Sequence, residues 1–344
     1  MANSDNKINI SDSWKGINTI QINIGDDWKD VSEAYINIGD VWKKFWIVGD
    51  RGIFAGGVTA VATKTIDYIT ISTTGNATDF GDLTVPKVGM TGTSNGTNGR
   101  GIFAGGQNST PTDLDVIDYI TILSPGTATD FGNLTAIKRY PAGSSNGTNE
   151  RGVSGGGYAT VGPIRFDVIE YITISNTGNA TNFGDLTTSR STISATSNGT
   201  NDRGVWGGGY APGTVSDIID YITISNTGNA TDFGNLTVAR YYSASTSNTT
   251  NERGVFAGGV SSTDVIDYIT INSASNATDF GNLLSAANRV APTSNGTNER
   301  GVFGGDMSSS NVIQYITIST TGNATDFGDL TVGRYGAGGA SNAS

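Results

Sequence analysis

The chain has 344 residues, among them 49 glycines, and it contains neither cysteine nor histidine. These absences exclude disulfides, thiolate metal sites, a histidine general base and a Ser-His-Asp triad. The formal net charge of −11 argues against a nucleic-acid-binding groove, and no apolar run is long enough for a transmembrane helix. We therefore expect no nucleic-acid partner, no membrane insertion, no metal and no cofactor.

Residues 1–48 contain a repeat of Trp-Lys pairs, each preceded by a Ser-Asp or Gly-Asp turn and by alternating apolar and polar residues. This pattern predicts a meander of three or more antiparallel strands, with one Trp- and Ile-bearing face and too few residues for its own core. An exposed apolar face marks a contact surface. We interpret 1–48 as an attachment or assembly module that docks through Trp14, Trp28, Trp42 and Trp46. Packing of this face on the rest of the chain is the alternative.

From residue 49 to 344, the same sequence motif recurs six times with a period near 50 residues. Each copy opens on Arg-Gly and a strand that ends in Gly-Gly. It continues with Ile-Asp-Tyr-Ile-Thr-Ile and then Ala-Thr-Asp-Phe-Gly-Asp-Leu, as at Tyr68 and Phe80. A fourth strand begins near a basic residue and leads through Ser-Asn-Gly-Thr-Asn to the next Arg-Gly. Such long-period repetition is typical of propellers and solenoids.

Four short strands per copy predict an all-β fold, a six-bladed β-propeller over residues 49–344. We assign the Gly-Gly pairs to crowding near the central axis, where only bare backbone fits. The first copy lacks its fourth strand, and residues 334–342 at the end of the chain supply it. We therefore expect the C-terminal strand to complete the first blade and close the ring.

The Gly-Gly strand, the tyrosine, Phe80-Gly-Asp-Leu83 and the following basic residue resemble the kelch repeat over residues 51–344. The phrases RGVFAGG and GNATDFGDL, with INIGDxWK near the N-terminus, are similar to virion structural and tail-fibre-like proteins of marine tailed bacteriophages, cyanophages among them. The first resemblance implies a kelch-like propeller. The second implies a protein of the virion, made in the host cytoplasm, in keeping with an N-terminus that does not have the form of a signal peptide.

No enzymatic activity is expected. Kelch-type copper oxidases need the histidine and cysteine that this chain does not contain. A carboxylate pair for sugar hydrolysis would have to come from recurrent acids, but one recurrent acidic position, Asp67 in the first copy, is Gln314 in the last. Such a position favours a contact between blades. Recurrent acids of the Asp79 type are expected to bond turns and strand ends rather than Ca²⁺.

The connections between strands divide into two constant and two variable kinds in each copy. In an up-and-down blade, the two variable kinds lie on the same face of the ring. Tyr, Arg and Asp on loops held by a rigid frame are the residue types of recognition surfaces, although drift in unconstrained loops is the alternative. The candidate ligand-binding residues are Asp113, Arg139, Tyr140, Tyr158, Arg165, Phe166, Tyr210, Asp217, Tyr241, Tyr242 and Arg289.

These patterns predict a phage virion structural protein, a tail-fibre or receptor-binding component that displays its propeller for host-surface recognition. The expected partners are other virion proteins, bound through the N-terminal module, and a glycan or protein of the host cell surface. We also expect a homo-oligomer, and a trimer would suit a fibre. Two alternatives stay open: a head or tail decoration protein without receptor binding, and a bacterial lectin-like surface protein.

Overall fold

The computed structural model describes residues 21–24, 27–30, 33–38, 41–47, 50–110, 112–162, 164–260 and 263–343. The chain divides into two compact units, Met1–Val48 and Gly49–Ser344, and each is described by itself. Both units are built of strands, and the helical residues of the described part are short 3₁₀ turns. No helix in these ranges is long and apolar enough to span a membrane.

The first unit contains two antiparallel hairpins, each flanking a predicted Gly-Asp turn. Their strands are β1 (Gln21–Ile24), β2 (Asp27–Asp30), β3 (Glu33–Ile38) and β4 (Val41–Ile47). Within the described residues each hairpin is a separate two-stranded sheet, so the predicted meander is not confirmed. The two registers are equivalent, with Asn23 opposite Trp28 and Asn37 opposite Trp42.

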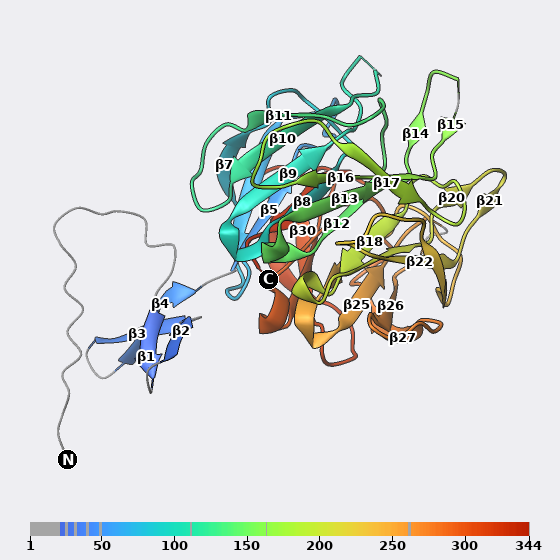
Figure 1. The fold of residues 1–344 in the computed structure, drawn as a ribbon. Coiled ribbons are helices and arrows are strands. Elements are labelled where there is room, and N and C mark those ends of the chain that lie inside the picture. Colours follow the sequence, from blue (N-terminus) through green and yellow to red (C-terminus); the bar gives the residue numbers. More distant parts are fainter. Residues whose placement is uncertain are drawn as a thin grey trace. The chain divides into compact units, whose positions relative to one another are not determined.

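The second unit is a β-propeller of six four-stranded antiparallel sheets, as predicted. We number the sheets as blades 1–6 in chain order (Figure 1). The innermost strands are β32 (Gly338–Ser341), β8 (Thr91–Ser94), β12 (Ala142–Ser145), β18 (Ser194–Ser197), β24 (Ala244–Ser247) and β28 (Ala291–Ser294). The second strands are β5 (Arg51–Ala55), β9 (Arg100–Ala104), β13 (Arg151–Gly155), β19 (Arg203–Gly207), β25 (Arg253–Ala257) and β29 (Arg300–Gly304).

The outer half of each blade carries the Tyr and Phe phrases. The third strands are β6 (Thr65–Thr70), β10 (Val116–Thr121), β16 (Val168–Thr173), β22 (Ile218–Thr223), β26 (Val265–Thr270) and β30 (Val312–Thr317). The outermost are β7 (Thr78–Asp82), β11 (Thr129–Asn133), β17 (Thr181–Asp185), β23 (Thr231–Asn235), β27 (Thr278–Asn282) and β31 (Thr325–Asp329).

Short elements join these strands at the two faces of the ring. Blades 3 and 4 carry the small hairpins β14 (Tyr158–Ala159) with β15 (Ile164–Arg165) and β20 (Tyr210–Ala211) with β21 (Thr214–Val215), which extend beyond the sheets in Figure 1. The Ser-Asn-Gly-Thr-Asn phrases, with Ser-Asn-Thr-Thr-Asn at the fourth position, form 3₁₀ turns. These are η1 (Gly96–Asn98), η2 (Gly147–Asn149), η3 (Gly199–Asn201), η4 (Thr249–Asn251) and η5 (Gly296–Asn298).

The ring closes as the sequence predicted. β32, at the end of the chain, pairs antiparallel with β5 and becomes the innermost strand of blade 1. Beyond it, Asn342 accepts a hydrogen bond from the Arg51 backbone N–H at 2.7 Å through its side-chain oxygen. Strands from the two ends of the propeller sequence therefore share one sheet, and opening the ring requires this sheet to be broken.

Apolar side chains fill the spaces between blades rather than the inside of any one blade. Six clusters each join two successive blades; between blades 1 and 2, for example, Ile53 and Phe80 pack with Phe103. The second strand is buried along most of its length, whereas the outermost strand begins exposed. The constant Tyr-to-Phe spacing has its reason here, because Tyr68 and Phe80 meet edge to face at 6.2 Å, a favourable aromatic geometry.

The arginines that open each repeat tie one blade to the next. The Arg51 guanidinium lies over the Tyr68 ring at 4.3 Å and donates to the Ile122 carbonyl of blade 2 at 3.0 Å. In each of the other blades, the equivalent arginine lies over the equivalent tyrosine ring. These arginines are Arg100, Arg151, Arg203, Arg253 and Arg300. This repetition gives these arginines the structural role expected from their recurrence.

The Gly-Gly pairs do not lie at the axis, contrary to the prediction. Gly56 and Gly57 follow a second strand and have φ of 64° and 103°, the left-handed region that glycine tolerates. A Cβ on Gly56 would lie 2.5 Å from the Lys87 carbonyl oxygen. Each Gly-Gly pair is therefore needed for two reasons. Its backbone makes a turn at positive φ, and the backbone that leads to the next blade passes too close for a side chain. The sequence shows that glycine is required but not which neighbour requires it.

Candidate functional site

Six residues, one for each blade, surround one mouth of the central channel in a left-handed backbone conformation. The chain reaches this position each time it returns from an outermost strand to the next innermost strand. The φ angles are all between 56° and 67°. We call these residues the mouth ring: Gly89, Tyr140, Thr192, Tyr242, Arg289 and Gly336.

The mouth ring is closed by a circle of backbone hydrogen bonds. Tyr140 N–H donates to Gly89 C=O at 2.6 Å, and Gly89 N–H donates to Gly336 C=O at 2.9 Å. The same bond links each further member to its neighbour, at 2.8–3.1 Å, until the circle returns to Tyr140. Because each bond joins two successive blades, the circle fixes the six connections relative to one another.

Gly89 makes room for a large side chain at this ring. A Cβ on Gly89 would lie 2.3 Å from the ring of Tyr140, so the tyrosine occupies the place of a side chain at Gly89. The left-handed conformation costs an ordinary L-residue about 1–2 kcal/mol, and Tyr140, Thr192, Tyr242 and Arg289 all adopt it. Strained backbone of this kind is often found at functional sites.

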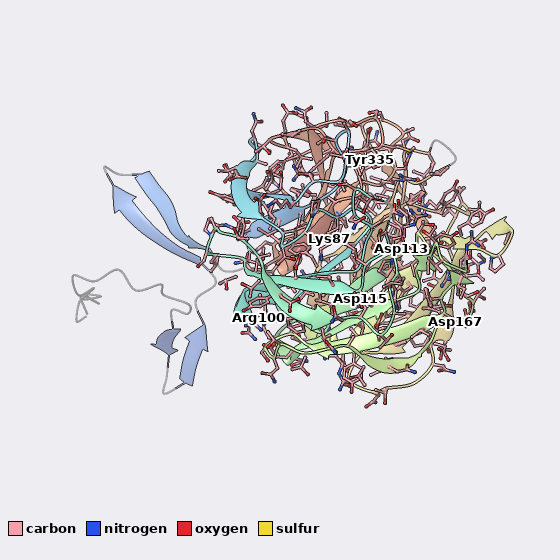
Figure 2. All side chains as sticks on the ribbon, turned by 90° about the horizontal axis from the view of Figure 1, so that it is seen from above. Lys87, Arg100, Asp113, Asp115, Asp167 and Tyr335 are labelled. Atoms are coloured by element: carbon pink, nitrogen blue, oxygen red, sulfur yellow. The ribbon has the colours of Figure 1, made fainter. Side chains whose placement is uncertain are left out.

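The side chains of the mouth ring meet above the channel. The rings of Tyr140 and Tyr242 are 5.1 Å apart and close to perpendicular. The Arg289 guanidinium lies 4.0 Å from the centre of the Tyr242 ring and 5.4 Å from that of Tyr335. Tyr335, labelled in Figure 2, was missed by the sequence analysis. Its position after Arg334 matches that of Tyr241 after Arg240, and this match could have identified it.

The same network continues onto the hairpins of blades 3 and 4. The Arg165 guanidinium lies 4.7 Å from the Tyr210 ring and 5.5 Å from the Tyr158 ring. Tyr210 then contacts Tyr241 at 5.4 Å, and Arg139 lies over Tyr158 at 5.3 Å. We call the connected set the Arg–Tyr cluster: Arg139, Tyr140, Tyr158, Arg165, Tyr210, Tyr241, Tyr242, Arg289 and Tyr335.

Asp113 is a buried residue that contacts the cluster through Arg139. It is 4% exposed, and its carboxylate accepts a 2.5 Å hydrogen bond from the Thr160 backbone N–H in blade 3. Arg139 Nε lies 3.7 Å from the same carboxylate, and Arg139 also donates to Gln107 at 2.6 Å. Asp113 thus joins the loops of blades 2 and 3, and it positions Arg139 rather than facing a ligand.

Two of the candidate residues are not joined to the cluster by any contact of the described residues. Phe166 is half-buried and its ring lies 5.2 Å from the Lys138 ammonium, a buried group below the loops. Asp217 is half-buried, and its backbone carbonyl accepts from Leu236 N–H at 2.8 Å. The remaining candidates, from separate variable connections, come together on one face.

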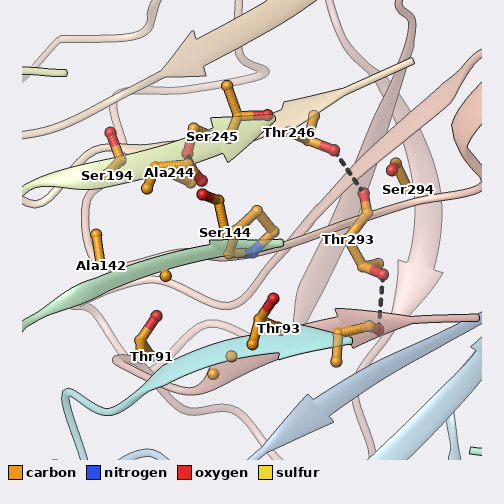
Figure 3. Close-up of a pocket in the computed structure, with 18 of the residues that line it drawn as sticks. Thr91, Thr93, Ala142, Ser144, Ser194, Ala244, Ser245, Thr246, Thr293 and Ser294 are labelled. Atoms are coloured by element: carbon orange, nitrogen blue, oxygen red, sulfur yellow. Dashed lines mark hydrogen bonds between the residues drawn. The ribbon is translucent and has the colours of Figure 1, made fainter. Parts of the chain in front are cut away.

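The channel below the mouth ring is lined by the innermost strands and has a volume of about 230 Å³. Figure 3 shows Thr91, Thr93, Ser144 and other small hydroxyl residues along its wall. Some hydroxyls bridge neighbouring strands: Thr246 donates to Thr293 C=O at 3.3 Å, and Thr293 donates to Ala340 C=O at 3.0 Å. Below Arg289 the wall is therefore uncharged, and it combines hydroxyls, some of them bonded to neighbouring strands, with apolar side chains.

Burial shapes the electrostatics of the mouth. Desolvation is the main reason that the pKa of Tyr242 is raised above its usual value, with a further contribution from Tyr140, while Arg289 acts in the opposite direction. The Tyr242 hydroxyl therefore stays protonated at any pH near neutrality. It remains a neutral hydrogen-bonding group next to a guanidinium.

The recurrent acids proposed as contacts between blades form buried ion pairs. Asp118 accepts from Thr84 Oγ1 at 2.5 Å and lies 3.1 Å from Lys87 Nζ, with both charged side chains fully buried; Lys87 is labelled in Figure 2. Desolvation lowers the pKa of Lys87, and Asp118 opposes that effect. Equivalent pairs are Lys138–Glu170, Arg190–Asp220, Arg240–Asp267 and Arg334–Asp67.

The connection between blades 5 and 6 shows why Gln314 departs from the pattern. Where the other connections carry lysine or arginine, this one carries Ala287, and Gln314 stands at the acidic position. Gln314 still accepts the Leu284 backbone N–H at 2.8 Å, the bond that the acids make elsewhere. Both charges are replaced together, which avoids the large penalty of a single unpaired buried charge.

Other sequence predictions concern metals and the N-terminal unit. Asp79 and its equivalents lie at exposed positions of the outermost strands, and the described residues contain no group of acids arranged to hold a metal ion. Trp14 lies outside the described residues. The backbone places Trp28 in β2 and Trp42 and Trp46 in β4, but their side chains are also outside the described part, so the assembly role stays a prediction.

Comparison with known proteins adds no family to this description. No protein-family model matches the chain, and no curated protein is similar to it at a significant level. The six four-stranded blades, consistent with a kelch-like propeller, are the firm result.

Proposed function

We propose that this protein is a recognition component of a phage virion, of the tail-fibre or receptor-binding type, and that its propeller binds the host surface. One observation carries the proposal: the Arg–Tyr cluster gathers side chains from several variable connections on one face of a closed ring. Tyr and Arg are the residue types that contribute most to binding surfaces. The constant turns of the repeats do not form this cluster.

The backbone circle of the mouth ring supports a binding role because it restrains the Arg–Tyr cluster in one arrangement. The circle of backbone bonds fixes the connections, and cation–π contacts such as Arg165 with Tyr210 hold the side chains against one another. A site that is rigid before binding loses less conformational entropy when a ligand arrives. Tyrosine faces suit sugar rings and arginines suit acidic groups, so a cell-surface glycan fits this face.

Two features support a role in a virion. The repeat sequences resemble those of phage fibre proteins, and the chain has a separate N-terminal unit. In this proposal Met1–Val48 attaches the protein to other virion proteins, and a trimer displays three propellers. The protein has no catalytic role in this account. The buried recurrent carboxylates are paired with lysine or arginine between blades, so they are not available to act on a substrate.

The test is adsorption of the fluorescently labelled full-length protein to a panel of marine bacterial cells, cyanobacteria included. We expect saturable binding to some strains and not to others. A matched variant carries Tyr241→Ser and Tyr242→Thr, which gives the connection into blade 5 the residues Ser191 and Thr192 of the previous connection. It should fold normally and lose adsorption. Absence of adsorption to every strain, including the host of the source virus, would favour a decoration protein instead.

A further inference from the structure

Two arginines of the propeller differ from all the others in their partners. Every other arginine donates a side-chain hydrogen bond to a protein acceptor, either a carbonyl, an amide or a carboxylate. Within the described residues, the side chains of Arg165 and Arg289 donate none and form no ion pair. Both belong to the Arg–Tyr cluster, and Arg289 also lines the channel mouth.

The contacts of Arg289 leave its hydrogen-bonding edge unused. A guanidinium carries five N–H donors in its plane and none above or below it. Tyr242, Tyr335 and Tyr140 lie against the group, at 4.0, 5.4 and 5.7 Å. Its Nε is buried and has no protein acceptor. The residue as a whole is half-buried, and its guanidinium forms no ion pair within the described residues of a chain whose net charge is −11.

A planar donor edge with stacked faces is the arrangement that recognises carboxylates by two parallel hydrogen bonds. The neighbouring tyrosines give flat apolar faces, and the channel wall adds small hydroxyls and backbone groups. The channel volume of about 230 Å³ is below the roughly 300–1,000 Å³ of pockets that enclose drug-sized ligands. The mouth therefore suits one small polyhydroxylated acid rather than a long chain within the channel.

We propose that the channel mouth is a binding site for a sugar acid, with the carboxylate held by Arg289 and the sugar ring against Tyr140 and Tyr242. This inference rests on the proposed function and names the ligand class of its site. The sugar acid can be a free monosaccharide or the terminal unit of a surface glycan. Tyr242 stays protonated near neutrality, so it donates to an anion instead of repelling it.

The test is calorimetric or NMR titration of the full-length protein with three sugar acids, D-glucuronate, D-galacturonate and N-acetylneuraminate, each beside a neutral sugar. Acetate serves as the carboxylate without a sugar ring. We expect at least one sugar acid to bind, its neutral counterpart and acetate to bind much more weakly, and binding to weaken as NaCl is raised. An acid-bearing oligosaccharide that binds more tightly than the free acid would identify a glycan as the source.

The mouth ring supplies a variant, and a left-handed residue outside it supplies the control. Arg289→Gly introduces the residue that the ring already uses at Gly89 and Gly336, so the backbone accepts it. Loss of a carboxylate–guanidinium contact should weaken binding by about ten- to hundredfold. Ser309→Gly makes the same kind of backbone change without removing a charge, because Ser309 is exposed and has a left-handed φ of 60°. It belongs neither to the Arg–Tyr cluster nor to the channel wall, so it should leave binding unchanged.

The outcomes separate this inference from the proposed function. If no sugar acid binds above its neutral counterpart, or if Arg289→Gly binds as wild type does, the inference is overturned. The proposed function still stands in that case if cells are bound and the Tyr241→Ser, Tyr242→Thr variant abolishes adsorption. Binding of sugar acids without adsorption to any cell would retain the site and overturn the host-recognition role.

Discussion

Arginine and tyrosine meet in two regions of the propeller, and the two regions use the pair differently. Inside the blades, Arg100 lies 4.4 Å from the Tyr119 ring and also donates to the carbonyls of Ile174 and Ser175 in blade 3. At the mouth, the Arg289 side chain stacks on tyrosine and donates no hydrogen bond to any described residue. The first pairing is complete within the protein. The second leaves donors for a ligand.

The difference also separates constant from variable sequence. The blade arginines recur at the start of every repeat because each one bridges to the next blade. The mouth residues change from blade to blade around a backbone circle that does not change. Because the mouth ring is held by backbone groups that every residue type carries, its side chains can vary from blade to blade while the frame is kept.

Deletion of residues 334–344 should have the largest effect on the frame. It removes β32 from blade 1 and leaves Asp67 buried without Arg334. Removal of one partner of a buried pair alone costs about 3–5 kcal/mol, and the lost strand adds to this. We expect loss of cooperative urea unfolding, whereas deletion of residues 343–344 should change little. Unchanged melting of the long deletion would contradict ring closure by β32.

The next largest loss of stability is expected from breaking a buried ion pair. Arg240→Ala leaves Asp267 unpaired in the interior, which should lower the free energy of unfolding by about 3–5 kcal/mol. The double variant Arg240→Ala, Asp267→Gln reproduces Ala287 and Gln314 and should recover most of that loss. Urea denaturation of the single and double variants measures both values. A double variant as unstable as Arg240→Ala would show that the neutral connection depends on features special to blades 5 and 6.

The smallest effect concerns Tyr242 and pH. Its pKa is raised in the folded protein, so its contribution to stability is complete below the unfolded value of about 10 and is lost as pH rises above it. Between pH 6 and 9 this contribution is constant, so Tyr242 should add no pH dependence to stability in that range. Thermal melts of Tyr242→Phe and wild type should differ in their pH dependence only above about pH 10. A difference already present at pH 8 would mean that the Tyr242 hydroxyl is not protected by burial.

The fold could be predicted because repetition and packing give the same answer. The Tyr–Phe interval survives in every copy because both rings fill the space between blades, and residues 334–342 match the strand that the first copy lacks. The role of the Gly-Gly pairs could not be predicted. Their glycines are required by a carbonyl from the next connection, such as that of Lys87, and no local pattern identifies such a distant contact.

The sequence predicted which residues of the candidate site lie on one face of the ring, but not how their side chains are arranged there. Variable connections identified Arg139, Arg165 and Arg289, since loops on one face must be neighbours. No sequence pattern indicates that Phe166 would turn toward Lys138, because alternation does not define side-chain directions in a short hairpin. The mouth ring also has no sequence signal, since it depends on backbone conformation and on hydrogen bonds between blades.

The most direct test of the account compares one variant from each region in the same two assays. Arg100→Gln should lower the melting temperature and keep cell adsorption, because its partners belong to the frame. The Tyr241→Ser, Tyr242→Thr variant should keep the melting temperature and lose adsorption. Loss of adsorption without loss of stability would establish the Arg–Tyr cluster as the recognition surface. Wild-type adsorption by the tyrosine variant would contradict that role.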